Sequence, residues 1–373
     1  MDTRTDLPEI RRKRGISAAR LAELAGVSRQ TIYAIEAGDY VPNTTLALQM
    51  ARILEVRVEE LFHLEGTPAA LPRAVPVHIL GGAGVARQGQ PVQLCRVGNR
   101  MMGVPAAPQP LMLPEADGVV VETSRHSDQA GVRMFPSDEP ETKRLLIAGC
   151  DPGISFLSQY LAKHGGVEMI VAPSSSHQAL EWLKQGSVHV AGSHLRDVST
   201  GDYNLPAIGK LFPGGGVKVV TFAIWEQGLV FASGNPKNIR GVEDLARKDV
   251  RMINREKGAG SRELLDQELR RLGVAAQNVR GYDRTAAGHL PAALAVSLGE
   301  ADCCIATRSA AQAFGLDFLP LATERYDLVI RRPHLKLPAV EQLLDGLNRA
   351  AIRRKLELLA GYDTSRTGEV RVA

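Results

Sequence analysis

The apolar positions in the first 65 residues repeat at the three- to four-residue spacing of short helices. Residues 21–25 place an apolar stripe on one helix, and Gly26 supplies the positive φ that a tight turn after a helix requires. Ser28 can cap a second helix over residues 29–37, because its hydroxyl can accept a hydrogen bond from a free amide of the first turn. The flanking patterns extend the prediction to a compact bundle of short helices over residues 7–62.

The second of these helices carries polar residues on its outer face. Two short helices joined by a glycine-containing turn, with such a face on the second, are typical of a helix-turn-helix that reads DNA. Residues 17–38 alone would also fit an ordinary helical hairpin, and the helices predicted on both sides favour the DNA-binding interpretation. The side chains at Arg11, Arg12, Lys13 and Arg29 would supply the positive charge. The residues expected to contact DNA are Ser28, Arg29, Gln30, Thr31, Tyr33, Asn43 and Thr44.

The motif LAELAGVSRQTIYAIEAGDYVPN, followed by ARILEV and ELF, resembles the lambda-repressor-like (Xre) helix-turn-helix family over residues 7–62. The resemblance implies that double-stranded DNA is a partner. Such heads bind paired half-sites about 34 Å apart, so we expect a homodimer or a higher even oligomer.

The pattern changes twice after this head. Residues 66–142 begin with a stretch rich in Pro and Ala and continue with short β-rich runs, which predicts a linker and a small β-rich module. The module could brace a dimer, dock on the next domain or position the DNA-binding heads. From residue 143, apolar runs of strand length alternate with helical patterns, which predicts parallel sheets with crossover helices in two similar halves. We therefore expect a multidomain protein with an all-α head at 1–65, the β-rich segment at 66–142 and a two-lobed α/β domain at 143–373.

The segment GNPKNIRGVEDLARKDVRMINREKGAGSRELLDQEL resembles the type II periplasmic binding proteins. A more specific resemblance is to the binding-protein-like domain that is fused behind helix-turn-helix heads and linked to molybdate. It rests on AGSHLRD, GDYN, EQGL, INREKGAGSR, GYDR, ERYDL and GYDTSRTGEV, spread over residues 145–370. This resemblance implies an oxyanion effector such as molybdate or tungstate, and no other cofactor. An organic acid or a molybdenum-cofactor precursor would suit such a cleft too.

Three loops that precede helices are candidate ligand contacts. Hydroxyl groups and free amides at a helix N-terminus form an anion site, although the serines at 174–176 could serve only as caps and the Gly-rich loop at 257–262 could be a plain turn with a surface Arg. The third loop, at 285–289, ends in a His that could donate to an anion or cap its helix. The candidate ligand-binding residues are Ser155, Ser174, Ser175, Ser176, Tyr203, Gly260, Ser261, Arg262 and His289.

Composition narrows the class of protein only a little. A chain of 373 residues with 44% hydrophobic residues and a net charge of +4 is typical of a globular protein with two or three domains. The sequence has no signal-peptide pattern and no apolar run of membrane-spanning length, so we expect a cytoplasmic protein without a membrane contact. The cysteines at 95, 150, 303 and 304 form no CxxC pair and are not near a histidine at metal-ligand spacing, so no metal site is expected.

The leading hypothesis is a one-component transcriptional regulator that senses a small ligand. We find no nucleophile elbow, paired histidine ligands, P-loop or dinucleotide-binding glycine motif, so an enzyme is not expected. The alternatives are an enzyme or carrier of molybdenum-cofactor metabolism with a helix-turn-helix head, and a transport-binding protein, against which the missing export signal and the intact head argue.

Overall fold

The computed structural model describes residues 3–64, 74–82, 85–106, 115–123, 128–136 and 143–371. It divides into two compact units, Met1–Arg73 and Ala74–Ala373, which are described separately below. The linker was predicted over residues 66–76, and its part at 66–73 lies outside the described residues. The predicted fold class, a helical head followed by a β-rich module and a larger α/β domain, is confirmed.

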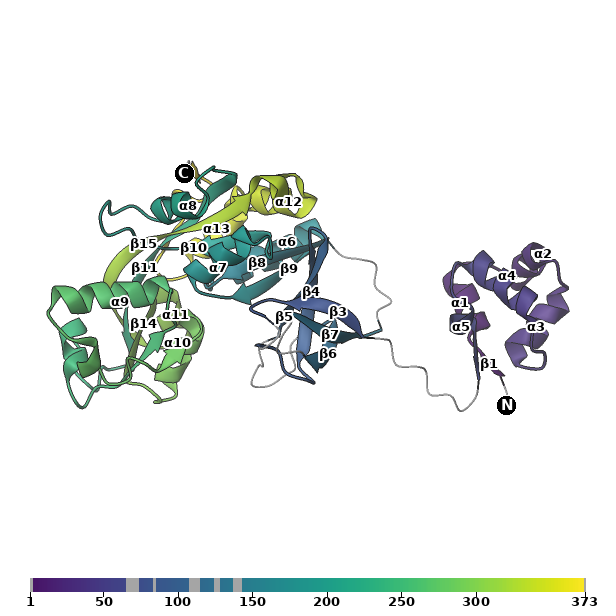
Figure 1. Ribbon diagram of the computed structural model, residues 1–373, viewed down its shortest axis with the longest axis horizontal. Helices are drawn as coiled ribbons and strands as arrows, with labels where there is room; N and C mark the ends of the chain where they lie inside the picture. Colours follow the sequence, from purple (N-terminus) through teal and green to yellow (C-terminus); the bar gives the residue numbers. More distant parts are fainter. Residues whose placement is uncertain are drawn as a thin grey trace. The chain divides into compact units, whose positions relative to one another are not determined.

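The N-terminal unit is a helical bundle around one apolar core. Its helices are α1 (Leu7–Lys13), α2 (Ala18–Ala25), α3 (Arg29–Ala37), α4 (Thr44–Leu54) and α5 (Val58–Leu61). Each of α2, α3 and α4 begins at a polar side chain that accepts a hydrogen bond from a first-turn amide, namely Ser17, Ser28 and Asn43. An additional pairing of β1 (Thr3–Thr5) with β2 (Phe62–Leu64), which the helical pattern did not predict, joins the two ends of this unit (Figure 1).

The β-rich module is a closed barrel. Its strands are β3 (Val75–Ile79), β4 (Pro91–Val97), β5 (Arg100–Pro105), β6 (Gly118–Thr123) and β7 (Gln129–Met134), in the spatial order β3-β5-β4-β6-β7. The barrel docks on the following α/β domain, because Leu80, Val97 and Val104 share a hydrophobic core with the first strands and helix α7 of that domain. Arg144 fixes the contact by donating to the carbonyl of Leu94 and pairing with Asp117 at 2.7 Å. Of the three roles considered for this segment, the structure shows docking.

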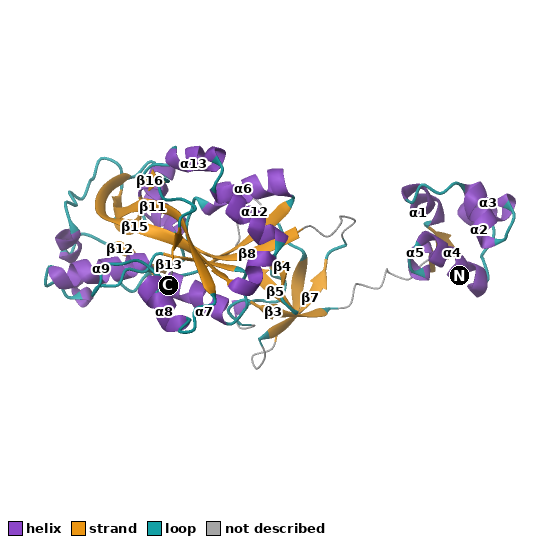
Figure 2. Ribbon diagram, turned by 90° about the horizontal axis from the view of Figure 1, so that it is seen from above, coloured by secondary structure: helices purple, strands orange, loops and turns teal. Residues whose placement is uncertain are grey.

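The α/β domain has two lobes on one continuous sheet, as Figure 2 shows from above. We define the first lobe as β8 (Lys143–Gly149), β9 (Val167–Pro173), β10 (Val190–Ser193), α6 (Ile154–Gly165), α7 (Ser176–Lys184), α8 (Leu205–Leu211), α12 (Pro338–Leu347) and α13 (Ala350–Glu357). We define the second lobe as η2 (Val242–Ala246), β12 (Met252–Arg255), α9 (Gly260–Arg271), η3 (Ala276–Asn278), β13 (Thr285–Ala286), α10 (His289–Ser297), β14 (Cys303–Thr307) and α11 (Arg308–Ala313).

Two long strands connect the lobes. β11 (Val217–Phe231) and β15 (Asp317–Arg331) pair antiparallel over their whole length, with register shifts near Ala223 and Gly228. The strand order is β13-β12-β14-β11-β15-β10-β8-β9, so β11 and β15 lie between the two sets of parallel strands. The chain returns to the first lobe along β15, which pairs with β10 there and is followed by η4 (Arg332–Lys336). The last strands, β16 (Tyr362–Asp363) and β17 (Val370–Arg371), also pair with β11.

Each lobe has its own apolar interior. One core of the first lobe includes Leu157, Leu343 and Leu356, whereas one core of the second includes Leu229 and Leu265. Separate cores allow the lobes to move as rigid bodies about the connecting strands. Among the described residues, none of the helices has both the length and the apolar character that crossing a bilayer requires.

Candidate functional site

The predicted DNA-reading face of α3 is open to solvent in the N-terminal unit. Arg29 and Gln30 are exposed, and Tyr33 keeps 45% of its surface accessible. The guanidinium of Arg29 donates to the hydroxyl of Tyr33 and lies over its ring, which holds both side chains in a defined position on the helix surface. Thr31 is half-buried, and its hydroxyl lies 2.8 Å from that of Ser28.

Two of the other residues predicted to contact DNA, Ser28 and Asn43, also cap helices. The hydroxyl of Ser28 accepts a hydrogen bond from the amide of Thr31, and Asn43 accepts one from Leu46, while Thr44 is exposed. Arg11 differs from its predicted role, because it pairs with Glu36 at 2.6 Å and is largely buried. Its charge fastens α1 to α3 and is not available to a phosphate.

In the α/β domain, the Ser-rich and Gly-rich loops meet across the two lobes. The amide of His177 on α7 donates to the carbonyl of Gly258, and the His177 ring lies 3.0 Å from the Glu263 carboxylate on α9. A Cβ at Gly260 would lie 2.6 Å from the ring of His194, so only glycine allows this close approach. The described conformation is therefore a closed one.

The three serines at the start of α7, Ser174, Ser175 and Ser176, have different roles. Ser175 caps the helix by accepting from Gln178, and Ser176 accepts from the amide of His194. The hydroxyl of Ser174 is buried without a hydrogen-bond partner among the described residues, as is that of Ser261 at the start of α9. Since a buried, unpaired hydroxyl group is costly, these two side chains are suited to receive a ligand.

Several predicted ligand contacts occupy structural positions instead. The guanidinium of Arg262 donates to the carbonyl of Arg255 and stacks 4.6 Å from the ring centre of Tyr282, so the predicted charged fork points away from the cleft. Ser155 is exposed and donates to the carbonyl of Pro152. In the described conformation both side chains bond to main-chain carbonyls, an orientation that the loop sequence does not fix, and their contact with a ligand stays a prediction.

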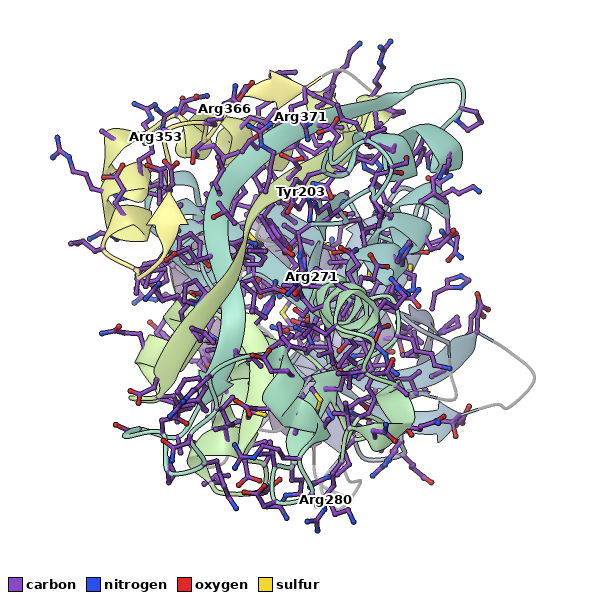
Figure 3. All side chains as sticks on the ribbon, turned by 90° about the vertical axis from the view of Figure 1, so that its left-hand side faces the viewer. Tyr203, Arg271, Arg280, Arg353, Arg366 and Arg371 are labelled. Carbon is purple, nitrogen blue, oxygen red and sulfur yellow. The ribbon has the colours of Figure 1, made fainter. Side chains whose placement is uncertain are left out.

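Tyr203 lies beside the connecting strands, close to Arg371 in Figure 3. Its hydroxyl donates to the carbonyl of Thr323, and its own carbonyl accepts from Arg371. Burial raises the pKa of its hydroxyl to about 12. This tyrosine therefore braces the region between the lobes in the closed form.

Three residues, of which only His289 is among the predicted ligand contacts, converge at the centre of the cleft. The sulfur of Cys150 lies 3.6 Å from Nε2 of His194 and 3.7 Å from Nε2 of His289. Cys150 follows β8, His194 follows β10 and His289 begins α10, so the cluster includes both lobes. The ligand atoms of the three residues lie within 4.8 Å of one another, a spacing that could hold a metal ion. Sequence reasoning missed this cluster because it considered only spacing along the chain.

The charges around this cluster are strongly perturbed. Burial alone would lower the pKa of His194, but the Cys150 sulfur and the Glu324 carboxylate outweigh it and raise the pKa to about 10. Burial and the nearby cations Arg255 and His194 lower the pKa of His289 well below its ordinary value. Burial also raises the pKa of Asp151 to about 7. Perturbed groups of this kind gather at functional sites.

Buried donors without partners border the same region. Nε1 of Trp225 and Nη1 of Arg255 make no hydrogen bond within the described part of the chain. The indole lies edge-on to both histidine rings, at 5.1 Å from His194 and 5.2 Å from His289. The hollow between His194, Gly260 and Glu324 has only about 10 Å³ of free volume, room for about one water molecule. A larger ligand therefore requires the lobes to separate before it can enter.

Comparisons with known protein families match both units. Residues 157–348 match the family described as PBP superfamily domain, and residues 9–61 match the family described as Helix-turn-helix. The uncharacterized protein YvgK of Bacillus subtilis is 36% identical over 234 residues, which are 62% of this chain and 75% of YvgK.

Two further comparisons concern one unit each. The uncharacterized HTH-type transcriptional regulator YgzD of Bacillus subtilis is 46% identical over 57 residues, 15% of this chain and 86% of YgzD. Among solved structures, the sulfate-binding protein SubI of Mycobacterium tuberculosis is 17% identical with a TM-score of 0.45, covering 59% of this chain and 86% of SubI.

Proposed function

Because the chain belongs to the PBP superfamily and carries an Xre-like helix-turn-helix domain at its N-terminus, we propose that it is a one-component transcriptional regulator in the cytoplasm. Its helix-turn-helix domain binds operator DNA, and its PBP-like domain binds a small ligand between the lobes. DNA half-sites occur in pairs, so the active form is a homodimer or a higher even oligomer.

The proposed effector is an oxyanion such as molybdate or tungstate. The observation that carries this proposal is the set of buried donors without partners, the hydroxyls of Ser174 and Ser261 and the indole N–H of Trp225. The amides at the start of α9, next to Ser261, add the positive end of a helix dipole. Neutral donors of this kind suit a tetrahedral dianion, because they lose less hydration than charged side chains on closure.

The ligand acts by favouring one lobe arrangement over the other. An effector can shift such an equilibrium only by its difference in affinity for the two conformations. The barrel docks on the first lobe through Arg144 and an apolar contact, so it moves with that lobe when the cleft opens or closes. The barrel lies between the DNA-binding unit and the ligand-binding domain in the sequence, so a movement of the first lobe is passed on through the barrel.

An enzyme of molybdenum-cofactor metabolism is the second candidate. Its support is the row of contacts from the Cys150 sulfur to the His194 ring and from that ring to the Glu324 carboxylate. A thiol next to an imidazole that is itself oriented by a carboxylate resembles the arrangement that activates a nucleophile. A sensor returns its ligand unchanged, whereas an enzyme releases a new product. Mass spectrometry of a molybdenum-cofactor precursor after incubation with the protein distinguishes the two.

Titration calorimetry of the full chain with molybdate, tungstate and sulfate tests the proposed effector. We expect binding of at least one anion, and Ser261→Ala weakens it about tenfold through the loss of a hydrogen bond to a charged group, on the order of 1.4 kcal/mol. Ser297→Ala is the matched control, because that hydroxyl is exposed at the C-terminal end of α10 and donates to the carbonyl of Leu294. The absence of heat with all three anions rejects an oxyanion effector.

A further inference from the structure

We propose that Cys150, His194 and His289 form a binding site for a transition-metal cation, with Zn²⁺ as the expected ion. The proposal is independent of the oxyanion effector, because it concerns different atoms and is tested with the metal alone. Thiolate and imidazole are the ligands that zinc prefers, whereas Mg²⁺ and Ca²⁺ prefer oxygen.

The distances match a tetrahedral zinc site. With a zinc–sulfur bond of about 2.3 Å and a zinc–nitrogen bond of about 2.0 Å, a tetrahedral angle places sulfur and nitrogen about 3.5 Å apart. The observed separations from the Cys150 sulfur are 3.6 Å to Nε2 of His194 and 3.7 Å to Nε2 of His289. The two sulfur–nitrogen separations therefore already fit a tetrahedral ion, and all three ligand atoms lie within 4.8 Å of one another.

A carboxylate orients one of the ligands. Nδ1 of His194 lies 2.7 Å from Oε2 of Glu324, and both side chains are buried. A proton on Nδ1 leaves the lone pair of Nε2 directed at the ion, which is the usual arrangement of a metal-bound histidine. Gln227 donates to the same carboxylate oxygen at 3.1 Å and keeps it in place.

The local charges permit a dication. The guanidinium of Arg255 interacts with the Cys150 sulfur, and Glu256 already pairs with that guanidinium at 3.0 Å and 3.1 Å. The negative charges of a metal-bound Cys150 thiolate and of Glu324 balance the two positive charges of Zn²⁺. Three protein ligands leave the fourth tetrahedral position open for water or an anion.

The placement of the ligands gives the ion a role in closure. Cys150 and His194 belong to the first lobe, and His289 belongs to the second. An ion bound to all three residues links the lobes directly. Without an ion, a Cys150 thiolate can accept a hydrogen bond from Nε2–H of each histidine, and the cobalt titration below separates that state from the metal-bound one.

Cobalt(II) titration of the full-length, reduced and metal-free protein tests the proposal in a buffer without oxyanions. We expect one cobalt ion per chain, a thiolate-to-cobalt charge-transfer band and the intense visible bands of tetrahedral cobalt, all displaced by one equivalent of Zn²⁺ and not by Mg²⁺. These spectra of the unaltered protein identify the ligand type and the geometry without any variant.

Variants then assign the ligands. Cys150→Ser abolishes the charge-transfer band, His289→Ala weakens binding at least tenfold, and Glu324→Gln, which keeps the side-chain size, weakens it about ten- to hundredfold. The controls are Cys95→Ser in the barrel and His164→Ala on the exposed face of α6, which leave the spectra unchanged. Circular dichroism of the metal-free variants verifies that they are folded.

Two results overturn the proposal. One is the absence of a tetrahedral cobalt spectrum in the unaltered protein, and the other is a charge-transfer band that persists in folded Cys150→Ser. Neither result affects the proposed effector, which is measured separately by calorimetry with the anions.

Discussion

At the residue scale, the clearest test of DNA recognition is Gln30. This side chain is exposed near the start of α3. A glutamine there can make a bidentate pair with adenine in the major groove, a contact worth about 1–3 kcal/mol of discrimination. We therefore expect Gln30→Ala to reduce affinity for the selected operator by about that amount, measured by fluorescence anisotropy.

Gln49 provides the matched control for this experiment. It is an exposed glutamine in the same unit, on α4 rather than on the recognition helix. Gln49→Ala is expected to keep the unaltered affinity. Equal affinity of the Gln30→Ala variant and the unaltered protein would contradict the assignment of α3 as the reading helix.

Single residues also show how much of the site could be predicted from sequence. The caps at Ser28 and Ser175 were predictable, because a serine before an apolar repeat has a local role that its neighbours define. The cluster of Cys150, His194 and His289 was not, since 44 and 139 positions separate the cysteine from the two histidines. Only the tertiary fold brings such residues together.

At the element scale, α7 and α9 are fastened by His177 and Glu263. The hydrogen bond to Glu263 raises the pKa of His177 above its ordinary value of 6.5, against a smaller opposing effect of burial, and Glu181 adds to the increase. The protonated histidine thus stabilises the closed form fully below pH 6.5, and this contribution is lost as the pH rises through the raised pKa. Because both side chains are partly exposed, the contribution is on the order of 0.5 kcal/mol.

Hydrogen exchange at residue 177 measures this pH dependence. The amide of His177 donates across the cleft to Gly258, so it is protected only while the lobes are closed. After correction for intrinsic exchange, we expect protection to fall as the pH rises above 6.5 in the unaltered protein. His177→Gln removes the dependence, and His164→Ala on α6 preserves it. An identical pH profile in His177→Gln would exclude the ion pair as its cause.

Helices and strands could be predicted from the sequence where the local spacing of apolar residues determines them. The helix starts and the alternation of strands and helices follow from apolar spacing, and they were predicted correctly. The apolar spacing at 338–360 is helical, and the structure divides this stretch at Asn348 into α12 and α13. The side chain of Asn348 donates to the carbonyl of Leu344, which ends α12 by competing with the main-chain hydrogen bonds. Such competition depends on tertiary packing as much as on sequence.

At the scale of the whole molecule, each of the two units has an apolar core of its own. Ile32 is fully buried in the N-terminal unit, and both tryptophans, Trp182 and Trp225, belong to the other. Ile32→Ala is therefore expected to destabilise only the head, by about 2–5 kcal/mol. On heating, tryptophan fluorescence should report the same unfolding transition as in the unaltered protein. The part of the helical circular dichroism signal that comes from the head should be lost at a lower temperature than in the unaltered protein.

Leu157→Ala in the first lobe is the reciprocal variant, since Leu157 is equally buried in the other unit. It is expected to shift the fluorescence transition and leave the head unaffected. A shift of the fluorescence transition by Ile32→Ala would mean that the units unfold together.

The pairing of β11 with β15 determines how easily the two lobes of the domain can move apart. A loop between lobes swings freely, whereas a ribbon that is hydrogen-bonded from Val217 to Phe231 resists bending and returns to its preferred curvature. Opening must therefore deform the ribbon elastically, most easily at the irregular register near Gly228. The stiffness of this ribbon, as much as any contact with the ligand, would then determine the concentration range over which the protein responds.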